Sequence, residues 1–171
     1  VSQQTVVMFG KTWMSHNLGA NTSLDPHNMA AGGASLHGNY YQWGRITPVA
    51  NASTGPGAIS GWNTTPASNG SWGASKTSQD PCPAGFRVPT HAEWQALVNC
   101  TSSSNTPNTW GSASTTQYGN AKVFTSGTSK LTLPASGTRF YTAGLLYNRG
   151  NYGLYWSSTE NGSNAYNLNF N

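Results

Sequence analysis

The sequence of residues 80–100 is DPCPAGFRVPTHAEWQALVNC, and this stretch contains the strongest helix signal of the chain. Thr90 can act as the N-cap, because its hydroxyl can accept a hydrogen bond from the Glu93 amide while the Glu93 carboxylate accepts one from the Thr90 amide. Apolar side chains follow at the i, i+3, i+4 spacing of one helix face, at Trp94, Leu97 and Val98. The pattern predicts a helix that begins after Thr90, and it makes Glu93 a capping residue and not a catalytic acid.

Downstream of this helix, the sequence has short runs that are typical of β-strands. They lie at Ala121–Phe124, Lys130–Leu133, Gly153–Ser157 and Ala165–Phe170. In the last run the side chains alternate with period two, which places Tyr166, Leu168 and Phe170 on one face. Asn167 and Asn169 then lie on the other face. We expect the first face to pack and the second to meet water or a ligand.

Upstream of the helix, regular structure is sparse. Thr5–Asn17 mixes alternation with β-branched residues around Gly10-Lys11, which predicts a hairpin with Trp13 pointing to the core. Residues Leu18–Gln79 are dominated by Gly, Asn, Ser, Thr, Ala and Pro, and this favours long functional loops held by aromatic residues. We interpret Thr101–Thr116 as a further polar loop. Since no repeat of 20 to 50 residues is visible, we expect one loop-rich α+β unit with little helix.

The composition excludes several classes of protein. Only 7% of the residues are charged, whereas 12% are aromatic and seven are Trp, a balance typical of an extracellular β-rich module and not of a disordered chain. The eight Lys and Arg are scattered singly, so the basic patch expected of a nucleic-acid-binding protein is missing. No stretch approaches the length of a membrane span, so direct membrane insertion is not expected. We expect one domain over residues 1–171 that is part of a longer chain.

Cys82 and Cys100 are the two cysteines, and they lie on either side of the predicted helix. In an extracellular setting an even number of cysteines favours a disulfide, and the connector before the helix is long enough to allow one. Cys82 and Cys100 are therefore a disulfide candidate. The alternative is a pair of separate buried thiols.

Several motifs become recognisable together. They are Trp13–Leu18 (WMSHNL), Tyr40–Gly44 (YYQWG), Asp80–Thr90 leading to Glu93, Trp94 and Leu97, and Tyr155–Thr159 (YWSST). In this order they resemble the Fibrobacter succinogenes major paralogous domain, over roughly Met8 to Phe170. That resemblance implies a C-type-lectin-like fold with one or two helices, a small twisted antiparallel sheet and long ordered loops.

Near the end of the chain lie Tyr147–Tyr152 (YNRGNY) and Asn161–Asn169 (NGSNAYNLN). These segments resemble the variable regions of proteins that are diversified by retroelements. In such proteins a stiff frame fixes the backbone while outward side chains change, and Tyr, Ser, Gly and Asn also dominate antibody binding sites. The residues expected to bind a ligand are Tyr141, Tyr147, Asn148, Arg149, Asn151, Tyr152, Glu160, Asn161, Asn164, Asn167 and Asn169. The alternative is a polar face that is merely soluble.

Metal and catalytic chemistry have weak signatures. The four acids are spread over the chain and the carboxylate cluster of a calcium lectin is missing, so we expect no metal. The four histidines lack the spacing of a zinc site, and neither cysteine is placed as the nucleophile of a formylglycine-generating oxidase. A hydrolase would require Glu160 to meet another acid, such as Asp25 or Asp80. We therefore expect no enzyme and no cofactor.

The tryptophans fall into two groups. Trp13, Trp43, Trp94 and Trp156 lie inside the motifs and are predicted to pack in the core. Trp62, Trp72 and Trp110 lie in polar loops, where they either stack on a ligand or pack beneath the loop.

These observations favour a recognition or adhesion domain that binds a protein or glycan on a cell or phage surface. We expect it on the bacterial surface, outside the cell, or on a phage virion. The alternatives are a structural or pilus-tip adhesin module of the bacterial surface and, third, a carbohydrate-active enzyme.

Overall fold

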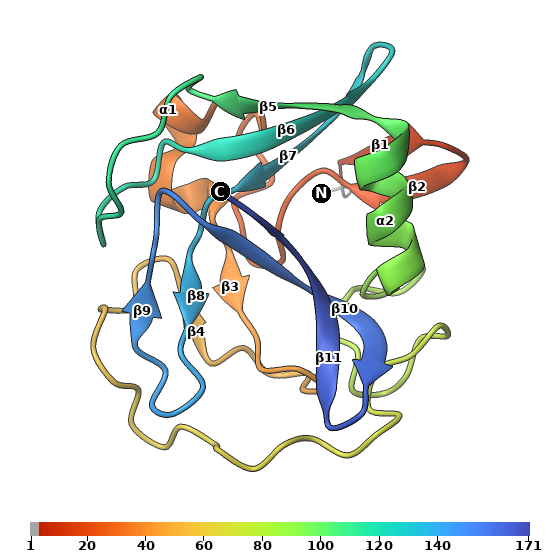
Figure 1. Ribbon diagram of the computed structural model, residues 1–171, viewed down its shortest axis with the longest axis vertical. Helices are drawn as coiled ribbons and strands as arrows, with labels where there is room; N and C mark the ends of the chain where they lie inside the picture. Colours follow the sequence, from red (N-terminus) through yellow and green to blue (C-terminus); the bar gives the residue numbers. More distant parts are fainter. Residues whose placement is uncertain (1–3) are drawn as a thin grey trace.

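The predicted helix is present, and it packs against the C-terminal hairpin. The computed structural model describes residues 4–171, and α2 spans His91–Cys100 (Figure 1). Both hydrogen bonds of the capping box form, with 3.2 Å from the Glu93 amide to the Thr90 hydroxyl and 2.9 Å from the Thr90 amide to the Glu93 carboxylate. Trp94 is buried and its indole N–H donates to the carbonyl of Trp156 at 3.0 Å.

The N-terminal hairpin consists of β1 (Thr5–Met8) and β2 (Lys11–Met14), paired so that Met8 lies opposite Lys11. The turn is therefore Phe9-Gly10, one residue before the predicted position, and both of its residues have positive φ (39° and 74°). This is the backbone conformation that tight hairpin turns require. Trp13 is buried as predicted, with its ring centroid 5.3 Å from that of Trp94.

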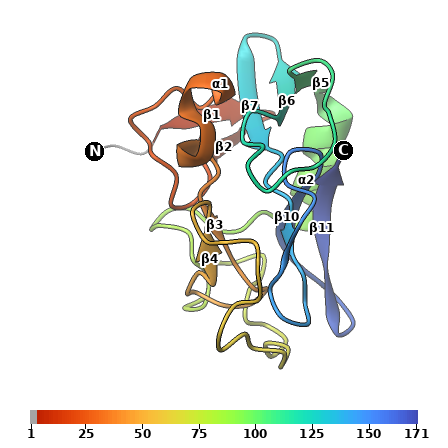
Figure 2. The same cartoon turned by 90° about the vertical axis from the view of Figure 1, so that its left-hand side faces the viewer.

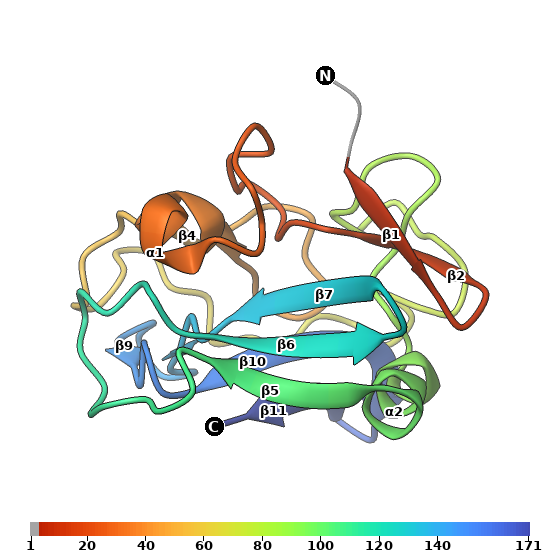
Figure 3. The same ribbon diagram turned by 90° about the horizontal axis from the view of Figure 1, so that it is seen from above.

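A three-stranded antiparallel sheet lies beside α2, in the order β5 (Ser102–Thr106), β6 (Ala121–Ser126) and β7 (Ser129–Pro134) (Figure 3). The strand β5 corrects the prediction of a continuous polar loop over Thr101–Thr116. Its sequence, SSSNT, has no apolar alternation, and its pairing with β6 along the whole strand supplies the order that its own side chains do not predict.

The C-terminal hairpin is formed by β10 (Gly153–Asn161) and β11 (Asn164–Phe170). Leu168 and Phe170 are buried in the main core together with Trp94, Leu97 and Phe124. The third residue predicted on this face, Tyr166, stacks on His91 at the start of α2, at 4.1 Å between ring centroids. The predicted packing face of β11 is therefore buried at Leu168 and Phe170, whereas Tyr166 packs on His91 but remains exposed.

The remaining elements are short and follow the long loops. They are α1 (Met29–Gly32), the 3-10 helix η1 (Gly33–Leu36), β3 (Asn39–Tyr40), β4 (Ala50–Asn51), β8 (Thr138–Arg139) and β9 (Leu146–Tyr147). Figure 2 shows the loop after β4 at one end of the molecule, with β3 and β4 between it and the β1–β2 hairpin. Each two-residue strand is paired antiparallel, β3 with β4 and β8 with β9.

These elements confirm an α+β class. In place of one small twisted sheet, the described residues form several separate antiparallel sheets of two or three strands. Two short α-helices accompany them. Among residues 4–171, none of the helices is long and apolar enough to cross a membrane.

Cys82 and Cys100 are both free, so the expected disulfide is not formed. The Asp80 carboxylate accepts hydrogen bonds from the amides of Cys82 and Val88, both at 2.9 Å, and closes the connector into a compact loop before the helix. Cys100 ends α2, which is about 15 Å long. Burial first, then the nearby Asp80 carboxylate, raises the pKa of Cys82 to about 12, so this thiol stays protonated.

Candidate ligand-binding surface

The residues predicted to bind a ligand lie on two parts of the structure. Tyr141 to Tyr152 belong to the β8–β9 hairpin and the turn that follows it, and Glu160 to Asn169 belong to the β10–β11 hairpin. Most remain accessible. Tyr141, Tyr147, Asn148, Asn161, Asn164 and Asn169 are exposed, and Asn151, Tyr152, Glu160 and Asn167 are half-buried.

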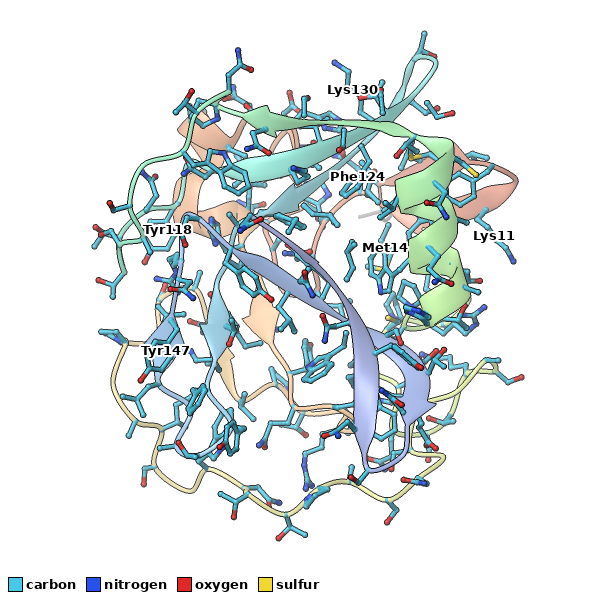
Figure 4. All side chains as sticks on the ribbon, in the orientation of Figure 1. Lys11, Met14, Tyr118, Phe124, Lys130 and Tyr147 are labelled. Carbon is cyan, nitrogen blue, oxygen red and sulfur yellow. The ribbon has the colours of Figure 1, made fainter. Side chains whose placement is uncertain are left out.

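Three exposed aromatic rings pack against one another on the β8–β9 hairpin, and we call them the aromatic cluster: Phe140, Tyr141 and Tyr147. Their exposed fractions are 42%, 73% and 47%. The Phe140 ring centroid lies 4.6 Å from that of Tyr141 and 5.4 Å from that of Tyr147. In Figure 4, Tyr147 lies at the left side of the molecule, well below Lys130. The sequence predicted Tyr141 and Tyr147 but missed Phe140, which lacks the polar character used to select the others.

Trp62 fixes the backbone that carries the aromatic cluster. Its indole N–H donates to the Tyr141 carbonyl at 2.7 Å, and the amide of Ile59 donates to the Ala143 carbonyl at 2.9 Å. Gly144 packs so closely on the indole that a Cβ there would lie 2.5 Å from its Cε3 atom. The loop after β4 therefore fixes the backbone from which Tyr141 projects.

Arg139 holds the same hairpin from inside. Its guanidinium donates to the carbonyls of Thr54, Gly55 and Gly144 at 2.8 to 3.2 Å, and it lies over the Tyr40 ring at 5.3 Å. Burial lowers the pKa of Arg139. Because these bonds join the two loops, Arg139 positions the cluster and is not itself displayed.

The prediction that Arg149 is displayed to a ligand is wrong. Only 3% of it is exposed, and its guanidinium donates to the Thr115 carbonyl at 2.6 Å and to the hydroxyls of Tyr118 and Tyr40 at 2.8 and 3.1 Å. It also stacks on the Tyr118 ring at 4.7 Å. Asn148 has a positive φ of 57°, so the chain turns there and Arg149 is directed inward. Its role is structural.

The outer face of β11 is polar, as predicted. The side-chain amide of Asn169 donates to the side-chain oxygen of Asn167 at 3.1 Å, which places both residues on one face. Trp156 of β10 lies opposite Asn167 in the ladder. The Glu160 carboxylate accepts a hydrogen bond from the Gly70 amide, so the hairpin tip is tied to the loop after β4.

A groove of about 940 Å³ connects the two parts of the surface. Tyr141, Asn164 and Asn167 line it among the predicted residues, whereas Tyr147, Asn148, Asn161 and Asn169 lie outside it. Further lining residues that the sequence did not single out as ligand-binding include Gln42, Arg45, Asn63 and Thr65.

Tyr41, Trp43 and Arg45 line the groove, and this segment is hydrogen-bonded to elements on both of its sides. Trp156 donates its indole N–H to the Tyr41 carbonyl and Trp43 donates to the Ser157 carbonyl, both at 2.9 Å. On the other side, Arg45 donates to the Thr65 carbonyl at 2.8 Å. Of the four tryptophans predicted in the core, Trp13 and Trp94 lie there. Trp43 and Trp156 are instead half-buried, with their indole N–H groups hydrogen-bonded.

The loop tryptophans differ from one another. Trp72 is buried and packs on Trp43 at 5.7 Å between ring centroids. Trp110 is half-buried against the core residue Phe170 at 6.2 Å. Only Trp62 of these three reaches the aromatic cluster.

The carboxylates are engaged within the protein. Asp25 accepts from the His27 amide, Asp80 from two backbone amides and Lys76, and Glu160 from Gly70. Burial alone would raise the pKa of Glu93, but the paired hydrogen bonds from Arg87 and the Thr90 amide lower it to about 2. Within residues 4–171, no three His, Cys, Asp or Glu side chains are grouped so as to hold a metal ion.

Comparison with known families assigns the chain. The family model of the Fibrobacter succinogenes major domain matches residues 6–170. The chain belongs to this family. In this Fibrobacter succinogenes major domain, the motifs that are far apart in sequence meet at Trp94, which contacts Trp13 and bonds to Trp156. No curated protein and no solved structure matches the chain.

Proposed function

We propose that this Fibrobacter succinogenes major domain is a non-enzymatic recognition or adhesion domain with a C-type-lectin-like fold. It binds a protein or glycan on a cell or phage surface through the polar and aromatic side chains of its C-terminal third. It acts outside the bacterial cell, on its surface or on a phage virion. A retroelement diversifies the exposed positions between Tyr141 and Asn169.

The observation that carries this proposal is the exposed aromatic cluster on a rigidly held hairpin. Exposing three large rings costs free energy that a protein recovers only when a partner covers them. The hydrogen bonds of Trp62 and Arg139 fix the backbone beneath the rings, so little order has to be gained on binding. Tyr and Trp are also the residues that most often dominate binding energy at interfaces.

The carboxylates support binding over catalysis. A two-carboxylate hydrolase needs one acid that is free to give up a proton and a second acid facing it. In this domain the acids serve capping, loop closure and ion pairing, as the contacts of Glu93, Asp80 and Glu160 illustrate.

A capture assay tests the proposal. The domain is immobilised and exposed to bacterial surface proteins and to a glycan array, and the variant Tyr141→Ala/Tyr147→Ala is compared with the parent. We expect the double variant to lose at least about tenfold in affinity for whatever the parent captures, with its melting temperature unchanged. Val7→Ala, which truncates an exposed apolar residue of β1, is the matched control and should keep full capture. Equal capture by the double variant contradicts the proposal.

A further inference from the structure

The charges that line the groove are unequal. The cations are Lys11, Arg45, Arg87 and Arg139, and Glu93 is the one carboxylate among the lining residues described. Arg87 and Lys11 both lie beside Glu93, at 2.8 and 3.6 Å. Glu93 offsets only one of these charges, so the lining stays positive, and Arg45 and Arg139 are the two lining cations with no carboxylate beside them within residues 4–171.

Arg45 is the cation that can reach a ligand. Within the described residues 4–171, its guanidinium makes one hydrogen bond, to the Thr65 carbonyl, and forms no ion pair. A guanidinium carries five N–H donors, so its remaining donors are available on a half-buried side chain that lines the groove. Arg139, in contrast, donates to three backbone carbonyls, and its Nε is buried, so its guanidinium is held between the loops.

The rest of the groove offers hydroxyl, amide and aromatic groups. Asn63, Thr65 and Asn167 line it together with Trp62 and Tyr141. Such side chains match the many hydroxyls and the apolar C–H faces of a sugar ring, since amides hydrogen-bond to hydroxyls and aromatic rings cover C–H surface. The volume of about 940 Å³ is that of a site for a small or oligomeric ligand. A folded protein would instead need a flush surface of about 800 Å² on each partner.

We propose that the groove binds an acidic oligosaccharide, with a sugar carboxylate at Arg45 and sugar rings against Trp62 and Tyr141. This inference rests on the proposed recognition function and names its ligand class. A carboxylate would accept hydrogen bonds from the remaining N–H donors of Arg45. Such charge-assisted hydrogen bonds are about twice as strong as neutral ones.

The test is isothermal titration calorimetry with carboxylated oligosaccharides and their methyl esters. The probes are oligogalacturonate, oligoglucuronate and a sialic-acid-terminated oligosaccharide, each beside its methyl-esterified form, which has the same rings but no charge. We expect at least one acid to bind at least about tenfold more tightly than its ester. Arg45→Gln should remove that preference, whereas Lys130→Gln, which removes an exposed cation of β7 that does not line the groove, should leave it intact.

Two further measurements keep the test decisive. Raising NaCl from about 0.05 M to about 0.5 M should weaken binding of the acid to the parent protein and leave binding of the ester unchanged. This measurement uses the parent protein alone, so it does not depend on the folding of a variant. Equal binding of acid and ester, loss of preference in Lys130→Gln, tighter binding of poly-glutamate, or no binding by any of the acids would overturn the inference. Capture of another ligand that depends on Tyr141 and Tyr147 would then leave the recognition function standing, and unchanged capture by their double variant would remove both.

Discussion

Arg149 illustrates what decides the role of a single residue in this domain. It stands among polar residues in a segment of Tyr, Asn and Gly, and the sequence predicted it at the surface. Its partners Tyr40, Tyr118 and Thr115 lie 31 to 109 positions away, so their meeting depends on the folded chain. A buried cation is retained because its hydrogen bonds replace those lost to water.

Replacing Arg149 should therefore destabilise the domain. Arg149→Met keeps the apolar stem but removes the donors to the Thr115 carbonyl and to the hydroxyls of Tyr40 and Tyr118. The two hydroxyls keep their own bonds to the Ser136 and Ala52 carbonyls. We expect unfolding in urea to show a loss of about 2 to 4 kcal/mol. Arg45→Met, at a less buried guanidinium with one hydrogen bond, should cost clearly less. Equal losses would mean that Arg149 is not a structural residue.

His37 makes stability depend on pH. Burial first, partly offset by the hydrogen bond to the Tyr118 carbonyl, lowers its pKa to about 4. The unfolded chain, with a histidine pKa of about 6.5, binds more protons than the folded domain between these values. The contribution of His37 to the free energy of unfolding is therefore fully present above pH about 6.5. It is lost as the pH drops toward 4, by up to about 3 kcal/mol.

Urea unfolding at a series of pH values measures this effect. His37→Gln should flatten the profile between pH about 6.5 and 4, although it lowers stability at neutral pH. His27, whose pKa is also lowered by burial, contributes in the same direction and remains in the variant as an internal reference. The Glu93 carboxylate, whose pKa is lowered from 4.5 to about 2, adds stability that is lost as the pH falls from about 4.5 to about 2, largely below the His37 range. A profile that is unchanged in His37→Gln would refute the assignment.

At the scale of elements, the sequence pattern predicted those helices and strands that are specified by neighbouring residues. The α2 helix follows from the Thr90–Glu93 cap and the Trp94–Leu97 stripe, and β11 follows from its alternation. The two-residue strands β3, β4, β8 and β9 carry too few side chains for any period to show. Their positions are set by distant bonds such as those of Arg139 and Trp62, which is why the sequence named Tyr141 and Tyr147 but could not predict the hairpin that brings them together.

The β8–β9 hairpin depends on the contact between Gly144 and Trp62. Gly144→Ala adds a Cβ 2.5 Å from the indole, at a residue with a φ of +74°. Gly127→Ala, in the turn between β6 and β7, adds the same strain at a φ of +59° but meets open space, so it is a matched control. We expect Gly144→Ala to lower stability by about 1 to 3 kcal/mol more than the control, measured by thermal unfolding. Similar melting temperatures would show that the hairpin does not need this contact.

At the scale of the whole molecule, the domain separates a tryptophan-rich interior from a displayed surface. Trp13, Trp94 and Phe124 lie in the main core, which α2, the β5–β6–β7 sheet and the β10–β11 hairpin enclose. The sequence predicted Trp13 and Trp94 in this core and the polar Asn face of β11, but Trp43 and Trp156, which it also placed in the core, are half-buried outside it. It did not predict the groove, because Arg45, Asn63 and Asn167 come together only through contacts between distant loops.

The central claim is that folding and ligand binding depend on different residues of this domain. The most direct test is a substitution scan that measures folded abundance and ligand capture separately at every position. We predict that substitutions at Tyr141, Tyr147 and Asn164 reduce capture at normal abundance, whereas those at Trp94 and Leu97 reduce both together. If capture falls only where abundance falls, the displayed surface has no role of its own and the account is contradicted.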